Sequence, residues 1–343
     1  MFKKIVSTIL VSSLLILSLT ACSRPTGNSS GSKEATSNGS NETITIRVGH
    51  VLAPTHPYTL GLEKFSELVA EKTDNKVKVE VFHSSQLGNE RDMVEGLQLG
   101  TLEMALVSTA PLSSFTDDFL VFDLPFMFKD TENARKVVDS EIGQNLLDSL
   151  KSQKILGLAY WENGFRNVTN NKKPIKTPDD LKGMKIRTME SPVQMESFNA
   201  LGASATPMAF GELFTALQQN TIDGQENPLA IISTSKFYEV QDYLSLTQHF
   251  YAPAPLLISQ SFFNNLDPDV QTAIKEAAIE ARDFERQALD DMNKSILEEL
   301  EASGMIVNEV DKEPFIKAVQ PVYEKFSDQI GADFIKQVQD AQN

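Results

Sequence analysis

The sequence predicts an α/β fold made of two lobes of related build, and three observations carry this prediction. Short apolar strands alternate with amphipathic helices from Thr43 onward, which is typical of a sheet covered by helices. A similar strand–helix run follows Thr177. Both runs also end alike, in LQLGTLE at residues 97–103 and LQQNTID at residues 217–223. One such match alone carries little weight, but equivalent positions in two similar runs indicate two related lobes.

The first run reads as β-α-β-α-β. Its expected strands are residues 44–48, 77–82 and 102–107. Apolar residues at helical spacing follow the first strand from Leu62. Asn89 is a suitable N-cap for the second helix, and Gly100 a suitable end. The order favours a parallel or mixed sheet.

The second run begins at Thr177, an N-cap candidate followed by a proline at the first helical position. A short strand is expected at 184–187, and a helix from Ser191 to Gly202. Another helix should cover roughly 210–219, with a further strand starting at Ile222.

The longest helical pattern starts at Asp267 and keeps an apolar face until Gly304. Roughly 35 residues span about 50 Å at the α-helical rise, so one long or kinked helix is expected to run along both lobes. The alternative is two helices that break near Asp290 and Asp291.

The N-terminus reads as a processing signal. Residues 1–21 combine Lys3 and Lys4 with an apolar stretch too short to span a bilayer, and LTAC at 19–22 resembles a bacterial lipobox. Lipidation of Cys22, the sole cysteine, is therefore expected; the alternative is a plain secretory signal. Residues 22–42 are rich in Ser, Gly and Asn and read as a flexible tether.

Composition excludes several classes of function. Lys and Arg total 31 against 47 Asp and Glu, a net charge of -16, which argues against nucleic-acid binding. A single cysteine and four scattered histidines supply no disulfide framework, zinc motif or iron–sulfur site. No cofactor or metal is expected. The sequence also lacks a GxSxG motif, a phosphate loop and a GxGxxG motif, so an enzyme is disfavoured.

Arg187 is the leading candidate for ligand binding. It ends the strand expected at 184–187, just before a helix start, where ligands of open α/β sheets bind. A guanidinium can hold a carboxylate through two parallel hydrogen bonds. The alternative is a surface ion pair with Glu190 or Asp180.

Eight stretches, in order, resemble the solute-binding proteins of tripartite ATP-independent periplasmic (TRAP) transporters, whose typical members bind C4-dicarboxylates. They are SQLGNER (85–91), FDLPF (122–126), NGFRN (163–167), DLKGMKIR (180–187), TPMAF (206–210), ALQ (216–218), DGQENP (223–228) and KFYEVQ (236–241). The set covers most of residues 44–300 and is specific as a whole.

The resemblance implies a class II periplasmic-binding-protein-like fold, with two α/β lobes joined by crossing strands and a long helix. The lobes would comprise residues 43–163 plus 253–292, and 164–252 plus 293–343. The lobes would close around an organic acid and deliver it to membrane subunits driven by an ion gradient.

The resemblance also implies the ligand contacts. Arg187 would be the main carboxylate clamp, Arg166 a second cationic contact and Asn227 an amide donor to the carboxylate. It also implies an aromatic wall, two distal polar contacts and a contact near the far rim: Phe210, Glu90, Ser108 and His249. His50 is expected to flank the mouth of the cleft, because it belongs to the loop at residues 49–57.

Four of these residues have a structural alternative. Phe210 also suits core packing, Glu90 suits the first turn of a helix, and Asn227 before a proline suits a turn. His50 is a polar loop residue that needs no ligand.

Two further interpretations compete with this one. A binding lipoprotein of an ATP-driven importer would share the lipidated tether and the two lobes, whereas the DGQENP stretch favours the ion-coupled family. A surface adhesion protein would show repeats or exposed aromatic tracts, and the sequence shows neither. The ligand is either a C4-dicarboxylate or a sugar acid such as a uronate. The expected protein is a monomer outside the cytoplasm, held to the membrane by its lipid alone.

Overall fold

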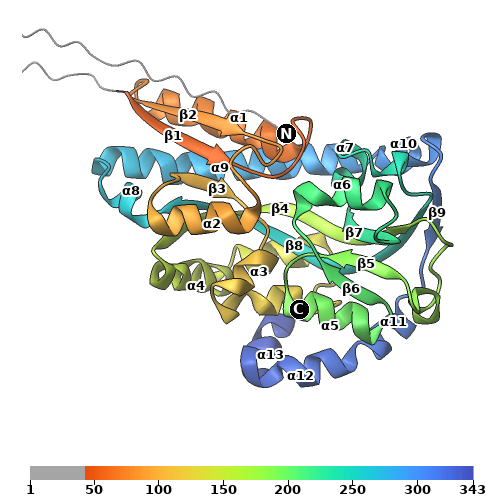
Figure 1. The fold of residues 1–343 in the computed structure, drawn as a ribbon. Coiled ribbons are helices and arrows are strands. Elements are labelled where there is room, and N and C mark those ends of the chain that lie inside the picture. The colour runs from red at the N-terminus through yellow and green to blue at the C-terminus, as the bar shows by residue number, and fades with distance from the viewer. Residues whose placement is uncertain (1–42, 343) are drawn as a thin grey trace, which may run out of the picture. The chain divides into compact units, whose positions relative to one another are not determined.

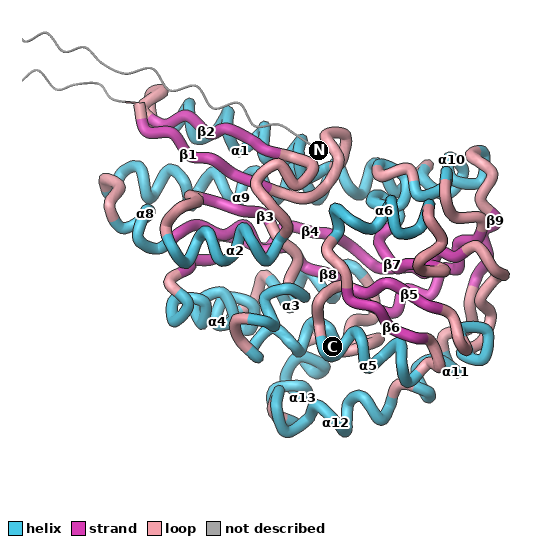
Figure 2. The backbone as a smooth tube through the Cα atoms, viewed as in Figure 1, coloured by secondary structure: helices cyan, strands magenta, loops and turns pink. Residues whose placement is uncertain are grey.

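The computed structural model describes residues 43–342 (Figure 1). The expected signal segment, the lipidation site Cys22 and the tether lie outside the described residues. Within residues 43–342 the strands form one mixed sheet. Their order is β2 (Val77–Phe82), β1 (Ile44–Gly49), β3 (Met104–Leu106), β8 (Tyr243–Ser259), β4 (Ile155–Asn170), β7 (Gly224–Pro228), β5 (Lys185–Thr188) and β6 (Ser204–Pro207), and β9 (Ile306–Glu309) pairs with β8. Helices cover this sheet (Figure 2).

The first strand–helix run forms three parallel strands, as predicted. β1 (Ile44–Gly49) lies between β2 (Val77–Phe82) and β3 (Met104–Leu106). α1 (Pro57–Lys72) and α2 (Glu90–Leu99) connect them, and Asn89 caps α2 through a reciprocal capping box. The strand expected at 102–107 is shorter. Gly100 adopts a left-handed φ of 71°, and the Leu102 N–H bonds to the Gly96 carbonyl in the same turn, so strand pairing begins only at Met104.

The second run repeats this arrangement. β5 (Lys185–Thr188) pairs in parallel with β6 (Ser204–Pro207) and with β7 (Gly224–Pro228). α5 (Pro192–Ala200) and α6 (Phe210–Gln218) are the expected helices. Two expectations need correction: the helix after Thr177 is a single 3₁₀ turn at Pro178–Leu181, and β7 begins two residues after Ile222.

The matching segments that end the two runs form matching turns. Thr101 and Thr221 each donate their N–H to the carbonyl five residues earlier, at 2.9 and 3.0 Å. The residue before each threonine adopts a positive φ, 71° at Gly100 and 54° at Asn220. The sequence match between the runs therefore corresponds to a shared local structure.

Two long antiparallel strands join the runs. β4 (Ile155–Asn170) pairs with β8 along most of its length, and β4 also pairs with β7. The pairing shifts register between Glu162 and Gly164 and between Arg166 and Val168. Gly164 adopts a φ of 104°, a region that favours glycine. These irregularities mark the part of each crossing strand that is best suited to bend.

The long helical pattern is split. α9 (Pro268–Asn293) ends before a two-residue turn, and α10 (Ile296–Ala302) follows. The prediction of one continuous helix is therefore wrong, and the break lies a few residues beyond Asp290 and Asp291. At the break, Lys294 N–H donates to the Asp291 carbonyl, a 3₁₀-type bond in a polar stretch. α9 still packs against both α1 and α7 (Leu229–Thr234).

The remaining helices lie between and after the two runs: α3 (Thr131–Val138), α4 (Glu141–Ser149), α8 (Gln260–Asn264), α11 (Glu313–Ala318), α12 (Gln320–Ile330) and α13 (Ala332–Asp340). The C-terminal helix α12 contacts the segment between the two runs and also the second run. Tyr323 on α12 donates to the Pro125 carbonyl, and α12 also packs on α5.

Two hydrogen bonds fix α9 to β4 just before the register shift between Glu162 and Gly164. The Glu285 carboxylate accepts the Glu162 N–H at 3.1 Å, and Arg286 donates to the Tyr160 carbonyl at 2.8 Å. In residues 43–342 no helix combines the length and apolar character needed to cross a membrane. These residues belong to one compact unit, so the lobe boundaries at 163/164, 252/253 and 292/293 stay a prediction.

Candidate ligand-binding site

Arg187 lies near the carboxyl end of β5 and is buried, with 2% of its surface exposed. Its Nε and Nη2 donate to the Met208 carbonyl at 2.9 and 2.6 Å, whereas its Nη1 has no partner within residues 43–342. The surface ion pair considered as an alternative is absent among the described residues: Asp180 binds Lys173 instead. One edge of the guanidinium is therefore anchored, and the Nη1 edge is available.

Burial lowers the pKa of Arg187 to about 10, and repulsion from Arg166 contributes, although the charge of Glu226 opposes the shift. Arg187 remains a cation at neutral pH. A buried cation without a full set of acceptors is costly, so this position favours the arrival of an anion.

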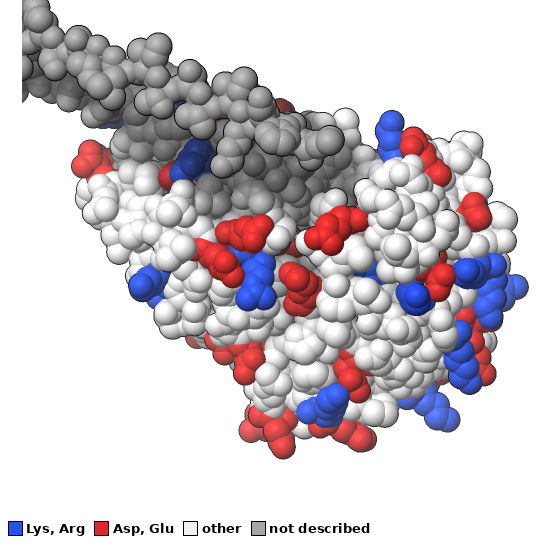
Figure 3. Space-filling view, viewed as in Figure 1, with Lys and Arg blue, Asp and Glu red and all other residues white. Residues whose placement is uncertain are grey.

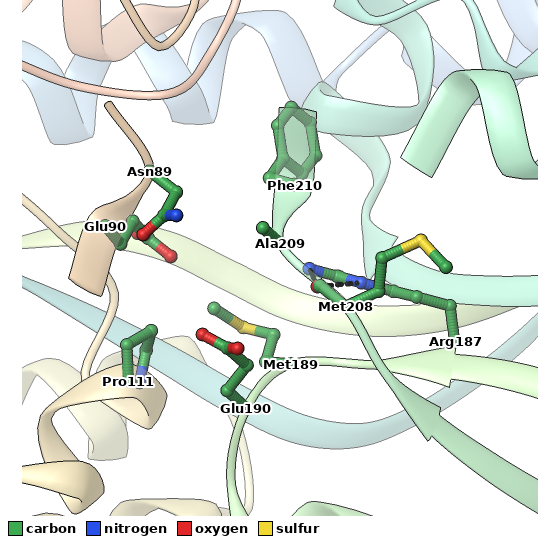
Figure 4. Close-up of a pocket in the computed structure, with 9 residues that line it drawn as sticks. All are labelled: Asn89, Glu90, Pro111, Arg187, Met189, Glu190, Met208, Ala209 and Phe210. Atoms are coloured by element: carbon green, nitrogen blue, oxygen red, sulfur yellow. Dashed lines mark hydrogen bonds between the residues drawn. The ribbon is translucent and has the colours of Figure 1, made fainter. Parts of the chain in front are cut away.

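Arg187 borders a small cavity between the two strand–helix runs (Figure 4). The lining comes from α2 and the 3₁₀ turn after β3 on one side, and from the ends of β5 and β6 on the other: Asn89, Glu90, Pro111, Arg187, Met189, Glu190, Met208, Ala209 and Phe210. This position beyond the carboxyl ends of parallel strands is where open α/β sheets bind ligands. The cavity volume is about 10 Å³, enough for about one water molecule.

Arg166 belongs to a buried cluster on the crossing strands and β7. It donates to the Glu226 carboxylate through Nε (2.5 Å) and Nη2 (2.7 Å). His249 is the third member, with its Nε2 3.2 Å from Glu226 Oε2. Of the Arg166 nitrogens, only Nη1 has no partner among the described residues, so one edge of its planar fork is already occupied by protein.

The charges within this cluster nearly cancel. Burial alone would raise the pKa of Glu226, but the charge of Arg166 and hydrogen bonds from His249 and Arg166 outweigh it and lower that pKa to about 2. Burial also lowers the pKa of His249, which favours its neutral form. The cluster therefore holds one cation and one anion.

Asn227 extends this cluster along β7. Its Oδ1 accepts from Arg166 Nη2 at 3.0 Å, and its Nδ2 donates to the Gln225 side chain, which in turn donates to Thr169 Oγ1 at 2.8 Å. Asn227 lies inside β7, so the turn considered as an alternative is wrong. In this structure its amide is engaged with Arg166 and Gln225.

Glu90 and Ser108 are buried residues of the first run, and of the two Glu90 lines the cavity whereas Ser108 does not. Glu90, the first residue of α2, accepts the Ser108 N–H through Oε1 at 2.6 Å. Asn163 Nδ2 donates to Ser108 Oγ at 2.9 Å. Burial raises the pKa of Glu90, while the hydrogen bond from Ser108 and the charge of Arg187 oppose that shift. Glu90 lines the cavity, so its place in the first helical turn does not preclude a ligand contact.

Phe210, His249 and His50 lie in different surroundings. Phe210 begins α6, lines the cavity and meets Phe237 edge to face at 6.1 Å. His249 binds Glu226 and does not line the cavity. His50 accepts the Leu52 N–H and contacts Thr59 Oγ1, so it holds the loop before α1 together. Burial lowers the pKa of His50 to about 3.

Several residues around the cavity and the cluster had no ligand-binding role predicted from the sequence. Among them are Glu226 and Gln225 in the cluster, and Met208 and Glu190 at the cavity. A glutamate beside Asn227 in a strand was an available signal for Glu226, since a buried acid requires a cation.

The two parallel runs, the crossing strands and a cavity between the runs that is lined by the buried Arg187 define a two-lobed solute-binding protein. The model of the bacterial extracellular solute-binding protein family 7 (DctP) matches residues 48–329, and the chain belongs to this family. The resemblance to TRAP solute-binding proteins is confirmed.

Three relatives illustrate the similarity. The 2,3-diketo-L-gulonate-binding periplasmic protein YiaO of Escherichia coli is 36% identical over 301 residues, covering 87% of this chain and 92% of its own. A TRAP solute-binding protein from Polaromonas, bound to D-erythronate, is 42% identical, with a TM-score of 0.85 over 86% of this chain and 98% of that one. One from Sulfurospirillum deleyianum, bound to succinate, is 38% identical, with a TM-score of 0.82 over 86% and 98%.

The cluster around Arg166 generates a prediction. Glu226→Gln should lower the free energy of unfolding by roughly 3–5 kcal/mol at pH 7, because it leaves a buried cation uncompensated. Since the pKa of Glu226 is depressed to about 2, its contribution is present above the unfolded pKa and is lost as the pH falls through about 2. Urea unfolding measures both effects.

The matched control is Glu301→Gln, an exposed acid on α10. Equal stability of the Glu226 variant and this control would contradict the assigned ion pair.

Proposed function

We propose that this chain captures a carboxylate-bearing organic acid outside the cytoplasm by lobe closure and delivers it to the membrane subunits of a TRAP transporter. The observation that carries the proposal is the buried Arg187 guanidinium, held on one edge by the Met208 carbonyl and without a partner at Nη1 among the described residues. Family membership favours this ion-coupled system over an ATP-driven importer.

The energetics suit this role. A charge-assisted hydrogen bond contributes about 1.5–3 kcal/mol net, so two of them supply much of the roughly 8 kcal/mol of a micromolar affinity. Arg166 Nη1 offers one further donor, on a side chain close enough to repel the charge of Arg187. The acidic surface is no obstacle to anion capture, because the donors act in a desolvated cleft; on the face seen in Figure 3, acidic and basic side chains are interspersed.

The relatives support an acid as ligand. The names and bound molecules of the three relatives are 2,3-diketo-L-gulonate, D-erythronate and succinate, and each carries a carboxylate. We propose a binding role without turnover, a monomeric state and no cofactor or metal. None of the acidic and histidine side chains in residues 43–342 forms a group suited to hold a metal ion.

Arg187→Lys should weaken binding at least about tenfold, nearly as much as Arg187→Ala, because an ammonium cannot offer two parallel donors to a carboxylate. Titration calorimetry with D-erythronate, galactonate, galacturonate and succinate measures the effect. Lys185→Gln, which removes an exposed cation from the same strand, is the control. Wild-type affinity in Arg187→Lys would contradict the clamp.

Lobe closure gives the next prediction. A cavity of about 10 Å³ is far too small for an acid the size of succinate, so the lobes must be apart before the acid binds and must close over it afterwards. The acid that binds most tightly in calorimetry should reduce the radius of gyration in small-angle scattering. An unchanged scattering curve at saturation would count against closure.

We propose further that Cys22 is lipidated and holds the protein at the outer face of the cell membrane, beyond the signal at residues 1–21. In a bacterial host, Cys22→Ser should release the protein from the membrane fraction and abolish palmitate labelling. Ser23→Ala is the matched control. Retention of Cys22→Ser in the membrane would refute the anchor.

A further inference from the structure

The charges around the cavity are unequal. Arg166 and Glu226 form a buried pair, so they contribute almost no net charge to the site. Arg187 is then the cation that lines the cavity, and the two acids that line it are Glu90 and Glu190. A bound carboxylate balances Arg187, and a second one would meet two acids without a matching cation in the lining.

Glu190 is the less constrained of these acids. It follows β5 by two residues and is half-buried. Its carboxylate takes part in none of the hydrogen bonds or ion pairs found within residues 43–342, whereas Glu90 is held by Ser108. Figure 4 shows the carboxylates of Glu90 and Glu190 on one side of the cavity and the Arg187 guanidinium on the other.

Resting on the proposed function, we propose that Glu190 is a specificity-determining residue that rejects a second carboxylate and makes the site select polyhydroxylated monocarboxylates. Ligand hydroxyls donate hydrogen bonds to carboxylate oxygens, so a sugar acid satisfies both ends of the cavity. A dicarboxylate satisfies Arg187 but places like charges together in a site that excludes water, which is a repulsive means of discrimination.

Matched pairs of acids test the proposal. D-Erythronate and meso-tartrate differ only at C4, which is a hydroxymethyl group in one and a carboxylate in the other. D-Galactonate and galactarate differ in the same way at C6. The wild-type protein should bind the monoacid of a pair at least about tenfold more tightly than the diacid by titration calorimetry.

Glu190→Gln keeps the size of the side chain and removes its charge. It should strengthen diacid binding about tenfold and change monoacid binding by no more than about threefold. Glu212→Gln, an exposed acid on α6 outside the cavity lining, removes the same charge and should leave the monoacid-to-diacid ratio unchanged.

The outcomes separate this inference from the proposed function. Diacid binding as tight as monoacid binding, or an unchanged ratio in Glu190→Gln, overturns the role of Glu190 while Arg187-dependent binding still supports acid capture. An equal shift in Glu212→Gln also overturns it, because the effect would then come from net charge. Binding of none of the acids to the wild-type protein contradicts the proposed function itself.

Discussion

A buried guanidinium with one edge anchored is the constraint on which the site depends. The Met208 carbonyl receives Nε and Nη2 of Arg187 and fixes its plane, which leaves Nη1 without an acceptor in the described part of the chain. The orientation is set before the ligand arrives, so little side-chain entropy is lost on binding. Burying the cation away from water is unfavourable in the free protein, and an anion that binds to it offsets this cost.

The crossing strands hold a second buried arginine, Arg166, in an ion pair with Glu226. β4 carries Arg166 and β7 carries Glu226, and their registers place Arg166 opposite Pro228 and Val168 opposite Glu226. The ion pair neutralises Arg166, so the cluster secures the junction of the strands without competing strongly with Arg187 for the ligand. The register shifts on either side of Arg166 put this cluster next to the irregular part of the crossing strands.

Local signals predicted most of the fold and only part of the site. The matching LQLGTLE and LQQNTID segments became matching turns, with positive φ at Gly100 and Asn220. The helix break after Asn293 was misjudged because helical periodicity continues across it. The pairing of Arg166 with Glu226 was not predictable from spacing, because these residues are 60 positions apart and meet only through the tertiary fold.

A crystal structure with a bound organic acid tests the central claim most directly. We predict a ligand carboxylate coplanar with the Arg187 guanidinium, with Nη1 as one of its donors and the Met208 carbonyl still on Nε. A ligand whose anionic group is held elsewhere, or a bound molecule with no anionic oxygen, would contradict this arrangement.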